Sequence, residues 1–212
     1  MEKYLNFKDK IDYNKLDEVA KIIRNGGVTI FPTETVYGIG ANGLDENAIK
    51  KLYEIKQRPF NKPISLLVSN INMIQMVTKD VTDVEYALIK EFFPGPLTLI
   101  LKKKNIVPDI LTSNTDTIGI RMPSNKIALE LLDKVGLPVA TSSSNISGKT
   151  SKTSLDNIEE YFKERIDCFI DDGQSKIGVS STVVKVVDNI PHILRTGPIS
   201  KGEIDNVCKR YL

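Results

Sequence analysis

Apolar residues recur with a helical period in several segments of the chain. Between residues 15 and 25 they stand at positions i, i+3, i+4 and i+7, beginning with Leu16, and a Gly-Gly pair ends the run. This spacing predicts an amphipathic helix with one buried face. Ser200 and Glu203 have the spacing of a capping box, which predicts a last helix. Similar patterns predict helices over residues 45–56, with Asp45 as N-cap, and over 83–92, 126–135 and 155–164.

Short apolar runs between these segments predict strands. Several runs are apolar throughout, which is typical of strands buried on both faces of a sheet. Helices and strands are intermixed, so we expect an α/β fold with a twisted mixed sheet and flanking helices. No internal repeat or Pro/Gly/Ser-rich linker interrupts the pattern, and we therefore expect residues 1–212 to form a single domain. The predicted strands are residues 28–31, 64–68, 97–101, 117–122, 139–141, 168–170, 182–187 and 192–194.

Composition narrows the class of protein. Hydrophobic residues make up 41% and charged residues 26% of the chain, as in ordinary globular domains. The 29 basic and 27 acidic side chains give a net charge of +2, so total charge does not indicate nucleic-acid binding. The charged N-terminus lacks the apolar core of a signal peptide, and no apolar run approaches the ~20 residues that span a bilayer. We expect a soluble, cytoplasmic protein without membrane contact.

Histidine and cysteine are too scarce for several common chemistries. His192 is the one histidine, so a multi-histidine metal site is excluded, and a Ser-His-Asp triad would have to use it. It lies in a predicted strand, where we expect a structural role. Cys168 and Cys208 form no CxxC motif, which excludes a zinc knuckle and a thioredoxin-type motif.

The segment 31–40 places polar residues and glycines directly after a predicted strand. Threonine hydroxyls and the Glu34 carboxylate at a strand end can point into a cleft, and glycines allow the backbone to approach a ligand closely. The same composition also fits an ordinary polar turn. The pattern alone leaves both interpretations open.

A basic cluster follows at residues 50–62, with five basic side chains and one acid, Glu54. Arginine and lysine in such a cluster suit a polyphosphate, since arginine makes planar bidentate contacts and lysine is a point charge. The alternative is that the cations stabilise the C-terminus of the preceding helix and face solvent. No Walker A motif is present, so phosphate binding by a P-loop is excluded.

Arg121 stands inside an otherwise apolar predicted strand. A buried guanidinium is costly unless it has an anionic partner. That partner is either a substrate carboxylate or a carboxylate of the chain itself, and the sequence favours neither.

Hydroxyl-rich segments at strand ends complete the inventory. Residues 141–148, 180–184 and 194–198 offer hydroxyls, an amide, an arginine and backbone N–H groups that suit phosphate or ribose, although the first also fits a flexible loop. No nucleophile–base pair is evident. Together the segments favour binding of a nucleotide and a small carboxylate, with chemistry by positioning and charge stabilisation.

These motifs resemble the YrdC/Sua5 family of threonylcarbamoyl-AMP synthases. The resemblance extends over about residues 15–200 and is that of the short, single-domain form. It implies an α/β YrdC/RibB-like fold with a concave, positively charged cleft. The motifs, in the order of the family, are Pro32-Thr33-Glu34-Thr35-Val36-Tyr37-Gly38, Lys56-Gln57-Arg58-Pro59, Pro94-Gly95-Pro96-Leu97-Thr98, Arg121-Met122-Pro123, Ser143-Ser144-Asn145-Ile146-Ser147-Gly148 and Ser181-Thr182-Val183.

The family implies a nucleotidyltransferase reaction. L-threonine and bicarbonate form a carbamate, which attacks the α-phosphate of ATP and yields threonylcarbamoyl-AMP and pyrophosphate. Mg²⁺ accompanies the ATP. A complex of partner proteins then transfers the threonylcarbamoyl group to adenosine 37 of tRNA.

The resemblance also implies roles for individual residues. Arg58, Lys62 and Arg121 would carry catalysis, with Arg58 and Lys62 on the ATP phosphates and Arg121 on the threonine carboxylate. The metal ligands are not assigned. Thr35, Thr141 and Ser181 would line the threonine pocket, and the remaining nucleotide contacts would be Thr117, Ser143, Asn145, Arg195 and, less closely matched, Ser151.

Three positions depart from the family pattern. Ser144 replaces the usual alanine, and Phe60 is bulkier than the usual small polar residue. Leu67 stands where some members carry a histidine, which removes one contact from the threonine pocket.

Two alternatives to the synthase remain. The first is a module that binds double-stranded RNA or tRNA without catalysis, for which Lys102, Lys103 and Lys104 offer a basic patch. The second is a related branch of the same fold, such as the YciO-like proteins or the carbamoyl-transfer domain of hydrogenase maturation. The Lys56-x-Arg58 and Ser143-x-Asn145 motifs argue against the second alternative.

Overall fold

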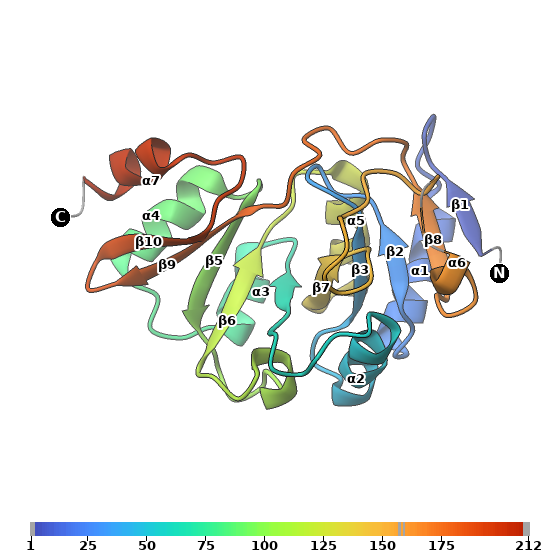
Figure 1. Ribbon diagram of the computed structural model, residues 1–212, viewed down its shortest axis with the longest axis horizontal. Coiled ribbons are helices and arrows are strands. Elements are labelled where there is room, and N and C mark those ends of the chain that lie inside the picture. The colour runs from blue at the N-terminus through green and yellow to red at the C-terminus, as the bar shows by residue number, and fades with distance from the viewer. Residues whose placement is uncertain (1–2, 157, 159, 210–212) are drawn as a thin grey trace.

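The computed structural model describes residues 3–156, 158 and 160–209. Within these residues the strands form a single mixed sheet of ten strands (Figure 1). Four neighbouring pairs are parallel (β1/β8, β2/β8, β4/β6 and β5/β9), and the others are antiparallel. The predicted α/β fold is confirmed. The spatial order is β1 (Tyr4–Asn6), β8 (Cys168–Asp171), β2 (Thr29–Phe31), β3 (Gly38–Asn42), β7 (Val139–Ser143), β4 (Ser65–Leu67), β6 (Thr117–Arg121), β5 (Leu97–Lys102), β9 (Thr182–Val187) and β10 (Ile190–Arg195).

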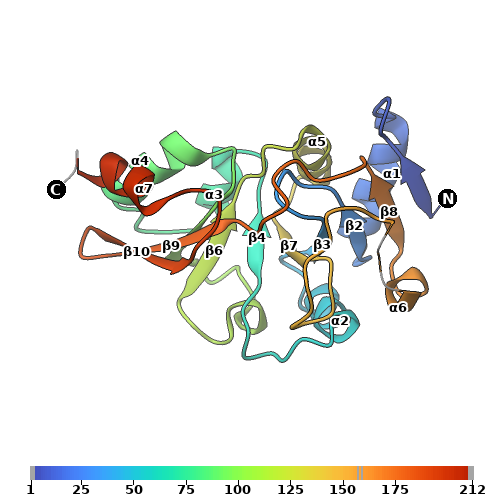
Figure 2. The same cartoon turned by 45° about the horizontal axis from the view of Figure 1, so that its top comes forward.

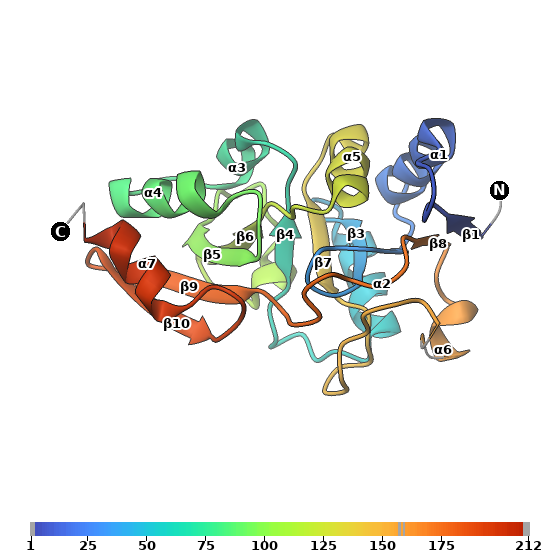
Figure 3. The ribbon, with the colours of Figure 1, turned by 90° about the horizontal axis from the view of Figure 1, so that it is seen from above.

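Helices cover both faces of the sheet. In Figure 3, α1 (Tyr13–Arg24), α3 (Ile71–Val77), α4 (Asp83–Phe92) and α5 (Lys126–Val135) lie along one face, and α2 (Glu46–Ile55) lies on the other. A sheet covered in this way buries both faces of its central strands, which explains their uniformly apolar runs. The remaining helical segments are α6 (Glu160–Lys163), α7 (Lys201–Cys208) and the 3₁₀ turn η1 (Asp109–Thr112). No described helix is long and apolar enough to cross a membrane.

The helix boundaries follow the caps that the sequence predicts. The Asp45 side chain accepts from the backbone N–H groups of Asn47 and Ala48 at the start of α2. Ser200 and Glu203 form the predicted capping box of α7. Gly136 ends α5 with φ 70°, in the left-handed region that favours glycine. Local side-chain chemistry therefore sets these ends.

The predicted helix over 155–164 is longer than the helix in the structure. Among its described residues, 155, 156 and 158 are not helical and Glu160–Lys163 forms α6, while positions 157 and 159 lie outside the described residues. The Ser154 hydroxyl accepts from the N–H of Asp156 at 3.2 Å, which stabilises a turn in place of a first helical turn.

Four elements are absent from the prediction: β1, β3, α3 and η1. The most important is β3 (Gly38–Asn42), because the sequence predicts a glycine-rich turn up to Gly40. A Cβ added to Gly38 would lie 2.9 Å from Thr141 Cγ2, and one added to Gly40 would lie 2.8 Å from Phe31 Cε1. The glycines therefore make room for side chains of neighbouring strands, and β3 pairs with β2 and β7.

One long connection links the two halves of the sheet. The segment between β8 and β9 runs across the middle of the molecule (Figure 2). The N–H groups of Ile177 and Gly178 donate to the carbonyls of Glu34 and Thr35, both at 2.9 Å. This connection brings the start of β9 close to β5, with Thr98 paired to Val183.

Candidate active site

A cleft lies in the middle of the sheet, where the ends of β3, β7, β4, β6 and β5 meet the start of β9. Its lining is rich in hydroxyls and holds three arginines. The lining residues are Thr33, Thr35, Val36, Tyr37, Gly38, Arg58, Pro63, Ile64, Ser65, Leu67, Thr98, Arg121, Thr141, Ser142, Ser143, Ser180, Ser181 and Arg195.

Two threonine hydroxyls after β2 are linked by hydrogen bonds. Thr33 Oγ1 donates to the carbonyl of Val36 at 2.6 Å and lies 2.9 Å from Thr35 Oγ1. Because the single hydrogen of Thr33 is used, Thr35 donates in the second contact. Thr35 is fully buried and keeps its oxygen lone pairs, so it offers the cleft an acceptor.

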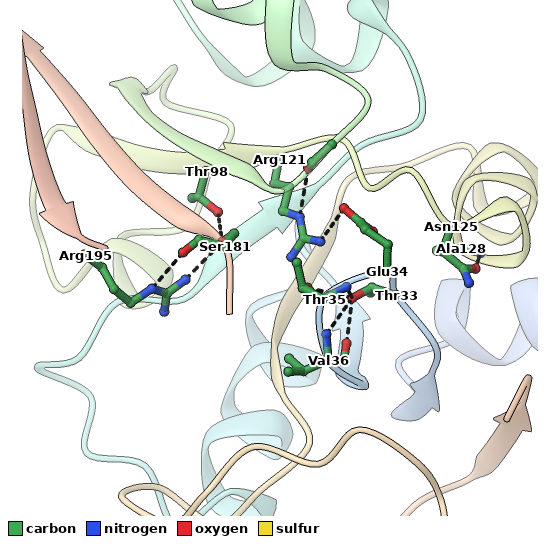
Figure 4. A network of polar contacts seen from close by, with 11 residues as sticks. Thr33, Glu34, Thr35, Val36, Thr98, Arg121, Asn125, Ala128, Ser181 and Arg195 are labelled. Carbon is green, nitrogen blue, oxygen red and sulfur yellow. Dashed lines mark hydrogen bonds and ion pairs between the residues drawn. The ribbon is translucent and has the colours of Figure 1, made fainter. Parts of the chain in front are cut away.

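Arg121 forms a buried ion pair with Glu34 (Figure 4). Arg121 Nη2 lies 2.7 Å from Glu34 Oε1, and Arg121 Nε donates to the carbonyl of Gly95 at 3.3 Å. The two side chains are 9% and 7% exposed. The chain therefore supplies an anionic partner for Arg121, while Arg121 still lines the cleft. Glu34 does not line the cleft itself, contrary to the expectation that its carboxylate points there.

A second network joins β5 to the last two strands. Thr98 Oγ1 lies 2.7 Å from Ser181 Oγ, and Arg195 donates to the Ser181 hydroxyl and carbonyl, both at 3.0 Å (Figure 4). Burial lowers the pKa of Arg195 from its ordinary value, and the charges of Arg121 and Arg58 lower it further. The positive fields of the three arginines therefore overlap in the cleft.

The basic segment after α2 is held by its own backbone. Arg58 Nε donates to the carbonyl of Lys62 at 2.9 Å, and Nη2 donates to that of Pro63 at 2.8 Å. The Tyr53 hydroxyl donates to the same Lys62 carbonyl at 2.9 Å. Burial lowers the pKa of Arg58 from its ordinary value. These contacts fix the Arg58 guanidinium at the cleft, but the Lys62 side chain is exposed and outside the lining.

A buried lysine anchors the loop that follows β7. Lys56 is 1% exposed, and its Nζ donates to the carbonyls of Ser143 and Asn145. The Asn145 amide donates to the carbonyls of Ile146 and Lys149, each at 2.8 Å. These contacts hold the loop in shape, and they engage the Asn145 side chain with the backbone of the loop itself. The predicted Ser-rich loop begins later than expected, because Ser142 and Ser143 belong to β7.

Seven predicted site residues meet at the cleft, and four do not line it. Lys62, Thr117, Asn145 and Ser151 lie outside the lining. Leu67, noted as a departure from the family pattern, is buried and belongs to the lining. The seven residues that line the cleft are Thr35, Arg58, Arg121, Thr141, Ser143, Ser181 and Arg195.

Glu34 and Thr98 belong to the side-chain networks of the site but are not among the residues to which the sequence assigns a role. Thr98 is a hydroxyl residue inside an apolar strand, the same signal that singled out Arg121. Glu34 could be paired with Arg121 only through the fold, because they are 87 positions apart.

The histidine and the lysine patch noted in the sequence do not line the cleft. His192 is an exposed residue of β10 and does not line the cleft. Lys103 pairs with Asp109 at 2.7 Å, and Lys104 donates to the carbonyl of Gln75 at 2.5 Å, so the lysine patch is largely engaged within the chain. Among the described residues no group of three or more His, Cys, Asp or Glu side chains is arranged to hold a metal ion.

Comparison with known proteins supplies independent information. The family model for Sua5, YciO and YrdC, described as "Telomere recombination", matches residues 21–197. The chain is 41% identical over 203 residues to a threonylcarbamoyl-AMP synthase of Pyrococcus abyssi and 39% identical over 210 residues to one of Bacillus subtilis. Each match covers 96% of the chain, and the chain spans about 60% of the length of each relative.

A solved structure has the same fold. P. abyssi Sua5 complexed with L-threonine matches with a TM-score of 0.93 and 41% identity. The match covers 96% of this chain and 60% of that one.

Proposed function

The chain belongs to the Sua5/YciO/YrdC family, and we propose that it is an L-threonylcarbamoyladenylate synthase. It would join L-threonine, bicarbonate and ATP, the last as its magnesium complex, into threonylcarbamoyl-AMP and pyrophosphate. The observation that carries the proposal is the composition of the cleft. The cleft combines an arginine paired with Glu34, several hydroxyls, and two further arginines that have no carboxylate partner among the described residues, and this set suits an amino acid and a polyphosphate.

The amino acid is proposed to bind at the Arg121 end. Arg121 would hold the threonine carboxylate with the guanidinium N–H groups that Glu34 and Gly95 leave available. Thr35 Oγ1 would accept from the amino group, because its own hydrogen is already donated to Thr33. Ser181 and Thr141 would complete the pocket.

ATP is proposed to bind at the Arg58 end. Arg58 and Arg195 would contact the phosphates, and Ser143 would contact the nucleotide. Lys62, Thr117, Asn145 and Ser151 do not line the cleft and remain predicted nucleotide contacts. Lys62 is exposed on the segment that Arg58 organises, so its flexible side chain could reach a bound triphosphate.

The chemistry would need no nucleophilic side chain. Threonine and bicarbonate lose water to form a carbamate, and a carbamate oxygen attacks the α-phosphorus of ATP while the bond to pyrophosphate breaks. The arginines would stabilise negative charge on the leaving pyrophosphate, and fixed positions would supply most of the remaining rate enhancement. Arg58 is suited to this task because two carbonyls hold its guanidinium in place.

The product would be consumed by another enzyme. Threonylcarbamoyl-AMP is a mixed anhydride, so it serves as an activated donor of the threonylcarbamoyl group. We propose that transfer-complex proteins pass this group to adenosine 37 of tRNA, and that the synthase acts in the cytoplasm alongside them.

An omission series tests the proposal. The protein is incubated with MgATP, L-threonine and bicarbonate in degassed buffer, and pyrophosphate and the adenylate are quantified. We expect product only when all three substrates are present. Arg58→Ala should lower the rate by about 10²-fold, the size typical for removing one charge-stabilising donor. Arg165→Ala, which removes an exposed arginine stacked on Tyr161, is the matched control. Pyrophosphate release that does not depend on threonine, or that survives Arg58→Ala unchanged, would refute the proposal.

A further inference from the structure

Glu34 is a buried carboxylate directly behind the wall of the cleft. It is 6% exposed and lines a separate hollow that it shares with Asn125 and Ser175. Its Oε1 contacts Arg121, while Oε2 is buried and has no hydrogen-bond partner among the residues that the structure describes. A carboxylate with one oxygen left without a donor keeps much of its negative field, because the protein interior screens poorly.

The three arginines of the cleft are not equivalent in charge. Glu34 lies within salt-bridge distance of Arg121. Within the described part of the chain, no carboxylate lies that close to Arg58 or Arg195, whose guanidinium groups are held by backbone carbonyls and a hydroxyl. The charge of Arg121 is therefore offset by a neighbouring carboxylate, whereas the charges of Arg58 and Arg195 are not.

We infer that Glu34 is a specificity-determining residue, which makes the Arg121 end accept a carboxylate of a zwitterion and reject phosphate. The inference rests on the proposed function and extends it. A phosphate group carries between one and two negative charges near pH 7, and a carboxylate carries one. Repulsion from Glu34 therefore penalises phosphate more than carboxylate, and an amino group on the ligand offsets the repulsion for an amino acid. The triphosphate is thereby directed to Arg58 and Arg195.

The assignment explains why an arginine that binds substrate is paired in advance. In a cleft with three unpaired guanidiniums, ATP, pyrophosphate and inorganic phosphate would compete with the amino acid for Arg121. With Glu34 present, the two substrates sort to opposite ends by charge. Glu34 acts through the field at Arg121 and is not expected to touch either substrate.

Competition between phosphate and threonine tests the inference. Binding of L-threonine to the full chain is measured by equilibrium dialysis with and without 10 mM inorganic phosphate, at about 0.1 M ionic strength. In the wild type, phosphate should change the threonine Kd by less than about twofold. In Glu34→Gln, which keeps shape and a hydrogen-bond acceptor, it should raise that Kd about tenfold or more, because the loss of a nearby negative charge strengthens phosphate binding at Arg121.

Three variants separate charge from structure. Glu34→Asp keeps the charge and should still exclude phosphate. Glu85→Gln alters a buried glutamate of the α4 capping box and should behave like the wild type. Glu34→Gln/Arg121→Gln contains no unpaired charge and should not gain phosphate binding. A merely structural role for Glu34 would change the threonine Kd without creating sensitivity to phosphate.

The possible results test the inference about Glu34 and the proposed function separately. Equal phosphate sensitivity in Glu34→Gln and the wild type would overturn the inference, as would phosphate competing with threonine in the wild type, a result that needs no variant. If the wild type fails to bind threonine, the proposed function fails. Direct phosphate binding then still tests the charge assignment, since Glu34→Gln should gain one site that the wild type lacks.

Discussion

The two ends of the cleft are built in different ways. At the Arg121 end, the arginine is paired with Glu34, a carboxylate that lies 87 positions away in the chain. At the Arg58 end, the arginine is held by carbonyls of its own segment, and Lys62 is exposed beside it. The first end depends on the whole fold, and the second depends on a local turn.

This difference indicates how each ligand would be recognised. A buried arginine held by an ion pair is positioned before binding, which favours discrimination between small molecules of similar size. At the Arg58 end the arginine is fixed as well, but the exposed Lys62 side chain beside it tolerates changes in phosphate position and contributes mainly charge. Substitutions should therefore have severe effects at the Arg121 end and graded effects at the Arg58 end.

We expect the substitution Arg121→Gln to have the largest effect. We expect threonine-dependent kcat/KM to fall about 10³-fold, because the substrate loses an ionic contact and Glu34 becomes a buried charge without a partner, which costs roughly 3–5 kcal/mol of folding free energy. The Kd for ATP, measured by titration calorimetry, should change by less than threefold. The measurements are substrate kinetics, ATP titration and thermal unfolding.

The double variant Glu34→Gln/Arg121→Gln separates the two effects of that substitution. It removes the unpaired charge, so it should recover most of the lost thermal stability but none of the threonine-dependent activity. If activity returns with stability, Arg121 serves the fold and not the substrate.

Lys62→Ala should have the smallest effect. The side chain is exposed and makes none of the hydrogen bonds that organise the turn, because these use its carbonyl. We expect KM for ATP to rise about two- to threefold, with the difference shrinking as salt is added, since exposed charge contacts are weak and screened. Lys50→Ala, which removes an exposed lysine paired with Glu46, is the control. A rise in the KM for ATP above tenfold would indicate that Lys62 is held as firmly as Arg121, and it would contradict the comparison between the two ends of the cleft.

The sequence predicts most helices because their signals are local. Apolar residues at helical spacing and the caps at Asp45, Ser200 and Gly136 act within a few residues of one another, and the structure confirms these helices. The segment 155–164 carried the same periodicity but fails as a helix at its start, where the Ser154 hydroxyl stabilises a turn.

Strand β3 and the pairing of Arg121 depend on tertiary contacts. Because glycine weakens a strand, Gly38 and Gly40 favour a turn when the sequence is considered alone. In the structure, side chains of neighbouring strands occupy the space in which their Cβ atoms would lie. The sequence predicts that Arg121 has an anionic partner but leaves a substrate carboxylate and a carboxylate of the chain as alternatives. The structure gives it Glu34 and leaves it on the cleft wall, so the structural pairing does not remove it from the site.

A crystal structure of the protein with L-threonine and a non-hydrolysable ATP analogue would test the division of the cleft most directly. The account predicts the threonine carboxylate on the Arg121 guanidinium, with Glu34 still paired behind it, and the phosphates on Arg58 and Arg195. Phosphate oxygens bonded to Arg121, or a threonine carboxylate bonded to Arg58, would contradict the account.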